Sequence, residues 1–189
     1  MAKTRLGFAL CGSFCTFDRA IDKMRELSAE YDIYPIMSHN AASTDTRFGK
    51  AQEHIKNIED ICGRKVISDI TKAEPIGPKD MIDILLISPC TGNTLAKLAN
   101  SVTDTSVTMA AKSHLRVQKP VVVALASNDG LAGTAKNLGN LLNCKNYFFV
   151  PFGQDNPLKK PFSIVADFDR IGDTLKLALK KEQIQPILI

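Results

Sequence analysis

The sequence predicts a single three-layer α/β domain over residues 1–189, with a doubly wound parallel sheet between two layers of helices. Two observations indicate this fold class. Short apolar segments typical of buried strands alternate with segments whose apolar residues recur at helical spacing. The length of 189 residues, of which 44% are hydrophobic, suits one core and leaves little room for a second domain.

Five apolar segments are predicted as strands, because each is short, continuous and bounded by turn-forming residues. They cover residues 5–11, 32–37, 82–88, 120–126 and 147–150. Pro35 has no N–H to donate, which argues against pairing on both sides of the second strand. Pro89 is expected to end the third strand.

Six segments with apolar residues at i, i+3, i+4 and i+7 spacing are predicted as helices. They cover residues 17–28, 51–62, 95–102, 107–115, 135–142 and 171–179. An apolar tail, residues 186–189, ends the chain. It is either an interface with a partner, or a segment that packs on its own domain or joins a homo-oligomer, and both alternatives stay open.

Composition argues against nucleic-acid and membrane partners. The formal net charge is only +4, and Lys and Arg alternate with Asp and Glu without forming a basic stripe. No stretch approaches the roughly 20 apolar residues that cross a bilayer. The first residues lead into a strand without a signal-peptide pattern, so a cytoplasmic location is expected.

Cysteine and histidine spacing predicts neither a disulfide framework nor a metal site. Five cysteines are scattered without a C-x-x-C pair, and reduced, mostly buried thiols are expected: Cys11, Cys15, Cys62, Cys90 and Cys144. Cys90 has no neighbouring His to activate it, so an ordinary thiol is favoured over a nucleophile. The three histidines share no ligand spacing and are read as surface or packing residues, with only His39 near the expected site.

Ligands of doubly wound sheets bind beyond the carboxyl ends of the strands, where this sequence is rich in small polar residues. The loops there are expected at residues 12–16, 38–50, 88–94 and 127–134. Ser13 and Thr16 can cap the helix after the first strand, and Thr91 can cap the helix after the third. Exposed N–H groups at such helix starts favour an anion. An ordinary strand-to-helix turn remains an equal alternative for the first loop.

The candidate cofactor-binding residues are those of these loops: Gly12, Ser13, Phe14, Ser38, Ser88, Thr91, Asn93, Thr94 and Asn128. For Asn128, a tight Asn-Asp-Gly turn competes with ligand contact. Arg47 and Lys50 could meet a carboxylate or phosphate, although solvated surface charges are favoured. No catalytic residue is identified.

Three of these segments together resemble the flavoprotein superfamily, which holds flavin-dependent cysteine decarboxylases and flavin prenyltransferases. They are Gly12-Ser13-Phe14, residues 88–99 with the sequence SPCTGNTLAKLA, and Asn128. The resemblance covers roughly residues 5–150. It implies a Rossmann-like fold of the flavoprotein type and FMN as a possible cofactor.

Two segments depart from the pattern of these enzymes. The decarboxylases carry a catalytic His before the third strand, and residues 74–80 of this chain, EPIGPKD, contain no His. Residues 125–128, LASN, keep only the Asn of a Pro-Ala-Met-Asn segment. The resemblance therefore implies no cysteine decarboxylase activity.

Over its full length the chain resembles the second subunit of a two-subunit oxidoreductase of spore-forming bacteria. That resemblance implies a small dicarboxylate substrate, a location in the mother-cell cytoplasm, and a hetero- or homo-oligomer. It also places NAD(P) on the first subunit of that enzyme, the expected partner. The absence of G-x-G-x-x-G after the first strand, where Gly12 stands alone, agrees with this division. A free-standing FMN-binding flavoprotein and a non-catalytic binding subunit remain as alternatives.

Overall fold

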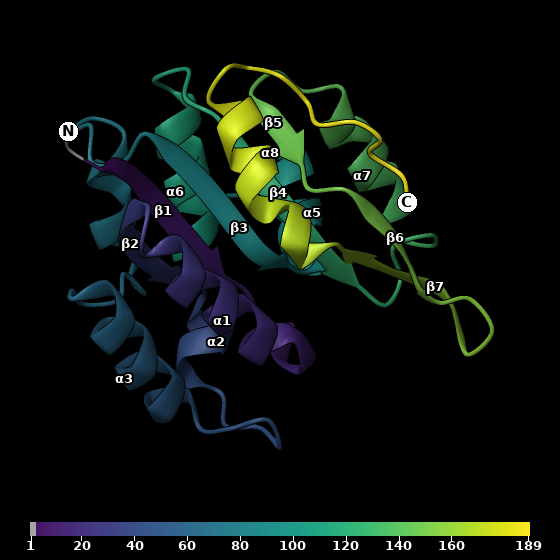
Figure 1. Ribbon diagram of the computed structural model, residues 1–189, viewed down its shortest axis with the longest axis horizontal. Coiled ribbons are helices and arrows are strands. Elements are labelled where there is room, and N and C mark those ends of the chain that lie inside the picture. Colours follow the sequence, from purple (N-terminus) through teal and green to yellow (C-terminus); the bar gives the residue numbers. More distant parts are fainter. Residues whose placement is uncertain (1–2) are drawn as a thin grey trace.

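The computed structural model describes residues 3–189, so Met1 and Ala2 of the predicted start lie outside the described residues. Within that range, seven strands form one twisted sheet between two layers of helices (Figure 1). This is a Rossmann-like α/β fold, as the alternation of apolar segments predicts.

Five of the strands are parallel and coincide with the five predicted segments. They are β1 (Thr4–Leu10), β2 (Tyr31–Met37), β3 (Ile84–Cys90), β4 (Val121–Ser127) and β5 (Tyr147–Phe149). The sheet order is β2-β1-β3-β4, with β5 beside the first half of β4. The direction of winding reverses between β1 and β3, and this switch point is where a ligand crevice opens in such sheets.

The helices cover both faces of the sheet (Figure 1). One layer contains α1 (Phe17–Leu27), α3 (Ala51–Cys62) and α8 (Ile171–Ala178). The other contains α4 (Ile70–Ala73), α5 (Gly92–Ala99), α6 (Ser106–Leu115) and α7 (Ala135–Leu142). Short elements join them: α2 (His39–Ser43), η1 (Phe14–Thr16), η2 (Glu74–Ile76) and η3 (Phe168–Arg170).

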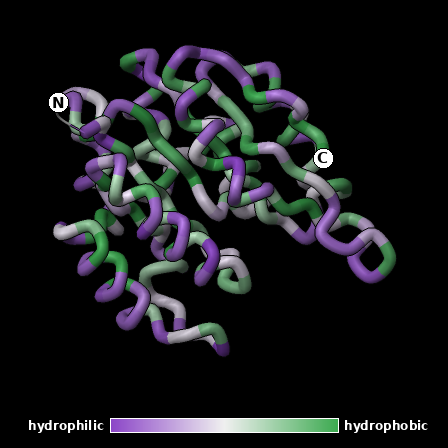
Figure 2. Tube along the Cα trace, viewed as in Figure 1, coloured by the Kyte–Doolittle hydropathy of each residue, from purple (hydrophilic) through white to green (hydrophobic). Residues whose placement is uncertain are grey.

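The core lies along the central strands, where Figure 2 shows hydrophobic residues. Every residue of β3 and β4 is buried, because helices cover both faces of these strands. β1 is buried from Leu6 to Leu10. The core therefore fixes the ends of these strands in position, and the loops that follow begin from fixed points.

A β-hairpin is the main element that the sequence does not predict. β6 (Phe152–Asn156) and β7 (Lys160–Ala166) are antiparallel, and β7 pairs with the end of β4. The sheet is therefore mixed and not wholly parallel as predicted. Much of the hairpin is exposed and polar, so it lacks the continuous apolar run that identifies a buried strand.

Two prolines are expected to restrict the strands, and the structure agrees with this expectation at Pro35 but not at Pro89. Pro35 lies in β2, the edge strand beside β1, as its missing N–H predicts. On the other side of β2 there is an isolated bridge to Ile67, whose N–H donates to the carbonyl of Pro35 at 2.9 Å. Pro89, in contrast, does not end β3, which continues to Cys90. The register between β3 and β4 shifts between Ile87 and Cys90, and at this irregularity no N–H from Pro89 is required.

Three further expectations need correction. The predicted polar loop after β2 contains α2. Residues 66–80, where the sequence predicts neither a strand nor a helix, contain α4 and η2. The thiols are not mostly buried, because only Cys11 and Cys90 are, whereas Cys15 and Cys144 are exposed.

The C-terminal tail packs back on its own domain, one of the two alternatives left open. The N–H of Phe152 donates to the carbonyl of Ile187 at 3.0 Å, and the N–H of Ile189 donates to the carbonyl of Phe152 at 3.2 Å. Leu188 and Ile189 nevertheless remain 67% and 63% exposed.

No helix among residues 3–189 is both long and apolar enough to cross a bilayer.

The burial of His114 on α6 predicts how acid lowers the stability of this fold. The residue is fully buried, and both ring nitrogens lack a hydrogen-bond partner among the described residues. Burial lowers the pKa of His114 from 6.5 to about 4. The folded state therefore binds this proton less readily than the unfolded chain, so stability is retained above pH 6.5 and lost as the pH falls toward 4.

We expect the wild type to lose about 3 kcal/mol of unfolding free energy through this group between pH 7 and pH 4. Urea unfolding across that range, on the wild type and on His114→Leu, measures it. The variant should show a shallower pH dependence whatever its stability at pH 7, and His39→Leu at an exposed position is the control. Equal pH slopes for the wild type and His114→Leu would contradict the assignment.

Candidate functional site

The loops that follow β1 and β3 meet at the switch point of the sheet. The N–H of Cys11 donates to the carbonyl of Pro89 at 3.2 Å. The Thr94 hydroxyl donates to the sulfur of Cys11 at 3.3 Å. Because these bonds join the two loops directly, one small ligand can contact both.

A main cleft of about 610 Å³ opens beside this junction. Its walls come from the loops after β1, β3 and β4, from the loop before α3, and from the β6–β7 hairpin. Six of the sequence candidates line it: Gly12, Ser13, Phe14, Thr91, Asn93 and Asn128. Arg47 also lines it, as an exposed side chain, whereas Lys50 does not line it.

An outer pocket of about 250 Å³ lies next to the main cleft. Its lining is rich in hydroxyl and amide groups and contains one cation, Lys97. Among the sequence candidates it contains Gly12, Ser38, Thr91, Asn93 and Thr94. Since Gly12, Thr91 and Asn93 line both cavities, the two form one continuous candidate site.

Ser88 is the sequence candidate that the structure separates from the others. Its side chain is fully buried in β3 and lines neither cavity. Its hydroxyl has no hydrogen-bond partner among the described residues. Ser88 lies inside β3, which continues to Cys90 and is buried along its whole length.

Helix starts are present at both cavities, but only part of the predicted capping occurs. Thr91 caps α5, because its hydroxyl accepts from the N–H of Thr94 at 3.2 Å. Ser38 caps α2 by accepting from the N–H of Ala41 at 3.3 Å. Ser13 and Thr16 make no capping bond. The Thr16 hydroxyl instead donates to the carbonyl of Ser13 at 2.8 Å, and the Ser13 hydroxyl lies 4.0 Å from the sulfur of Cys15 at the wall of the cleft.

Asp129 lines the main cleft and holds the fourth loop together, a role that the sequence does not indicate. Its Oδ1 accepts from the hydroxyl of Ser127 at 2.5 Å and from that of Thr134 at 2.7 Å. These two bonds hold the pKa of the Asp129 carboxyl below its usual value. Gly92, the first residue of α5, packs against the same three side chains.

The β6–β7 hairpin supplies the other residues that the sequence did not indicate. Asp155, Lys160, Ser163 and Val165 line the main cleft. Lys160 forms an ion pair with Asp155 at 2.6 Å. The charged groups that line the cleft are therefore the Arg47 guanidinium, the Lys160 ammonium with its partner Asp155, and the Asp129 carboxylate. No motif distinguishes these residues, because they follow from a hairpin that was itself not predicted.

The two buried thiols next to the site, Cys11 and Cys90, are poor nucleophiles. Burial raises the pKa of Cys11 to about 11, and burial raises the pKa of Cys90 well above the usual value of a thiol. Both are therefore protonated at neutral pH, and the preference for an ordinary thiol at Cys90 agrees with this environment.

The segment where related decarboxylases carry a His forms a turn against α6. The Ser113 hydroxyl donates to the carbonyl of Glu74 at 2.5 Å and accepts from the N–H of Gly77 at 2.9 Å. A Cβ at Gly77 would overlap the carbonyl of Ser113. This turn is part of the packing and contributes no side chain to either cavity.

The fold and the site at the β1–β3 switch point define a flavin-type α/β protein. A family model described as Flavoprotein matches residues 1–173, and the chain belongs to the flavoprotein family. It is 46% identical over 186 residues to the second subunit of dipicolinate synthase from Bacillus subtilis (strain 168), covering 98% of this chain and 93% of that protein.

Two solved structures share this fold. A crystal structure of the second subunit of dipicolinate synthase from Bacillus halodurans superimposes with a TM-score of 0.91 at 41% identity, covering 100% of this chain and 97% of that one. The FMN-dependent cysteine decarboxylase SpaF superimposes with a TM-score of 0.67 at 21% identity, covering 95% and 97% of the two chains.

Gly92→Ala tests the contact between α5 and the fourth loop. A Cβ there would lie 2.7 Å from Ser127 Oγ and 2.9 Å from Asp129 Oδ1, and closer still to Thr134 Oγ1. These side chains are short and bonded to one another, so they cannot move aside without breaking the network. We expect a loss of about 1–3 kcal/mol of unfolding free energy in urea titrations.

Gly139→Ala in α7 is the matched control, because a Cβ there meets nothing within 4 Å. Removing a glycine from a helix should raise stability by about 0.5–1 kcal/mol. If both alanine variants changed the free energy of unfolding equally, the inference that Gly92 packs closely against the fourth loop would be wrong.

Proposed function

We propose that this chain acts as the second subunit of a dipicolinate synthase, together with the first subunit of that enzyme, in the sporulation pathway that produces dipicolinate. The observation that carries the proposal is 46% identity over 98% of the chain to a protein of that name, an alignment that includes the whole candidate site. The reaction is oxidation of dihydrodipicolinate, in which a hydride passes to NAD(P)⁺ and a proton is released as the ring becomes aromatic.

The roles proposed for the two polypeptides follow from the ligands that each must bind. Hydride transfer needs the nicotinamide within contact distance of the dihydropyridine ring. This chain lacks the three-glycine turn that holds a dinucleotide pyrophosphate. The first subunit is therefore the proposed NAD(P)-binding partner, and this chain completes or shapes the site for the dicarboxylate.

The main cleft has the groups that a dianionic substrate requires. Arg47 provides a guanidinium, which lies 4.8 Å above the ring of Phe48. Thr91 places the N-terminal N–H groups of α5 at the same cleft, where the helix dipole favours negative charge. Asn93 and Asn128 add amide groups. We assign one substrate carboxylate to Arg47 and the other to the start of α5.

A free-standing FMN-binding protein is the second candidate, favoured by the outer pocket. Ser38, Thr91, Thr94 and Thr105 supply hydroxyl groups there, and Lys97 supplies a positive charge. This donor set suits a phosphate, and the adjoining main cleft has the volume for a flat ring system, so the residues fit FMN. A bound flavin would supply a hydride acceptor, and Phe14 and Asn128 would hold its ring. A non-catalytic binding subunit with the same cavities is the third alternative.

Reconstitution distinguishes these functions. The chain is purified alone and with the first subunit, incubated with dihydrodipicolinate and NAD⁺ or NADP⁺, and assayed for the pyridine product and for a visible flavin spectrum. We expect steady product formation only when both polypeptides are present. Turnover by the isolated chain would contradict the proposal, and a stoichiometric flavin band with that turnover would establish the second candidate.

Arg47 is predicted to bind substrate in the reconstituted enzyme. Arg47→Gln should raise KM for dihydrodipicolinate about tenfold with a smaller change in kcat, because it removes one charge-assisted contact. Arg47→Lys should recover part of the loss, and Lys56→Gln on the exposed surface of α3 should have no effect. An unchanged KM in Arg47→Gln would rule out the assignment.

No decarboxylation of peptidyl-cysteine or phosphopantothenoylcysteine is expected, because the turn at 74–80 contains no His. Carbon dioxide release from either compound by the purified chain would show this expectation to be wrong.

A further inference from the structure

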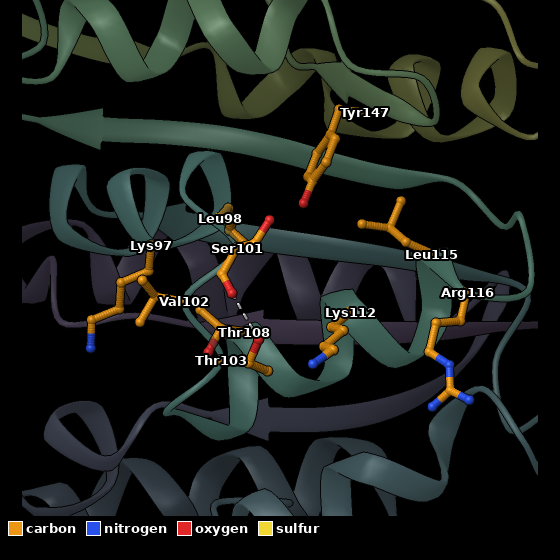
Figure 3. A pocket seen from close by; sticks show the side chains of 10 residues that line it. All are labelled: Lys97, Leu98, Ser101, Val102, Thr103, Thr108, Lys112, Leu115, Arg116 and Tyr147. Carbon is orange, nitrogen blue, oxygen red and sulfur yellow. Dashed lines mark hydrogen bonds between the residues drawn. The ribbon is translucent and has the colours of Figure 1, made fainter.

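A third cavity of about 370 Å³ lies beside the candidate site, between α5, α6 and the start of β5. Its volume falls within the range of small-molecule sites. Figure 3 shows the 10 side chains that line it. None of them lines the main cleft, and only Lys97 is shared with the outer pocket.

The inner wall of this cavity is apolar. Leu98 comes from α5, Leu115 from α6, and the ring of Tyr147 from β5. Val102, in the loop after α5, is 43% exposed. Three separate elements thus present hydrophobic surface to one space, and a ligand with an apolar group of matching size would remove that surface from water.

The charged side chains of the cavity are all positive. Lys97, Lys112 and Arg116 line it, and no carboxylate does. Lys97 is paired with Asp104 at 2.8 Å. Lys112 and Arg116, in contrast, form no ion pair with any residue from 3 to 189. Two cations without protein counter-charges therefore flank an apolar wall.

Tyr147 adds a polar group inside the cavity. Figure 3 shows its hydroxyl pointing toward Ser101 and Leu115, with Lys112 and Arg116 on the opposite side. This hydroxyl has no hydrogen-bond partner in the described part of the chain. Burial raises the pKa of Tyr147, so the group stays protonated and can donate a hydrogen bond at neutral pH.

We propose that this cavity binds a compact organic anion, a carboxylate or phosphate carried on an aromatic or other apolar group. The apolar part would lie against Leu98, Val102 and Leu115, and the anion would contact Lys112 and Arg116. An uncharged ligand would leave the two cations without partners, and an inorganic anion would leave the apolar wall in water. The site is distinct from the switch-point cleft and does not depend on the function proposed for it.

Phenyl phosphate is a suitable probe for an NMR titration of the full chain. We expect saturable shifts at the amides of residues 98–103, 112–116 and 147. Benzyl alcohol and inorganic phosphate, which each carry half of the recognised chemistry, should bind there at least about tenfold more weakly. Amides of residues 12–14 and 91–94 report separately on the switch-point site, so binding at that site is not mistaken for binding at this one.

Matched variants assign the contacts. Lys112→Gln combined with Arg116→Gln should weaken phenyl phosphate about tenfold, and Tyr147→Phe roughly threefold. Lys56→Gln combined with Lys180→Gln removes the same charge at exposed positions outside the cavity and should leave affinity unchanged. The proposal is overturned by absence of saturable shifts at residues 98–103, by equal affinity for benzyl alcohol, or by equal weakening in the control pair.

Discussion

The pairing of β1 with β3 is the constraint on which the candidate site depends. These neighbouring parallel strands end together, and the chain leaves them toward opposite faces of the sheet. The crevice between the two departing segments cannot be closed by either helix layer. Bonds from Cys11 to Pro89 and from Thr94 to Cys11 hold its two sides together. The core thus fixes the position of the N–H and hydroxyl groups that face a ligand.

Secondary contacts give this crevice its shape. Asp129 joins Ser127 to Thr134, and Gly92 allows α5 to approach that network closely. The β6–β7 hairpin extends the wall on the far side of β4, which turns an open crevice into a cleft with charged groups on both sides. The outer pocket supplies hydroxyl donors that suit a phosphate, and the wider main cleft supplies charged side chains. The two are therefore parts of one continuous site with different chemistry.

The sequence predicts the parallel strands and the loops of the site well, because both leave strong local patterns. Continuous apolar runs identify β3 and β4, and small polar residues after them mark Thr91, Asn93 and Asn128. Ser88 lies buried in β3 and lines neither cavity, because a register shift allows the strand to continue past Pro89, where the sequence indicates a strand end. Asp155 and Lys160 cannot be found in this way, since their position depends on long-range pairing of β7 with β4.

A crystal structure of the chain grown with dipicolinate tests the central claim that the β1–β3 switch point holds an anionic ligand. We predict the dianion in the main cleft, with one carboxylate at the Arg47 guanidinium and the other within hydrogen-bond distance of the N–H groups at the start of α5, beside Thr91. Dipicolinate bound elsewhere on the chain, or a main cleft filled only by water at saturating dipicolinate, would contradict it.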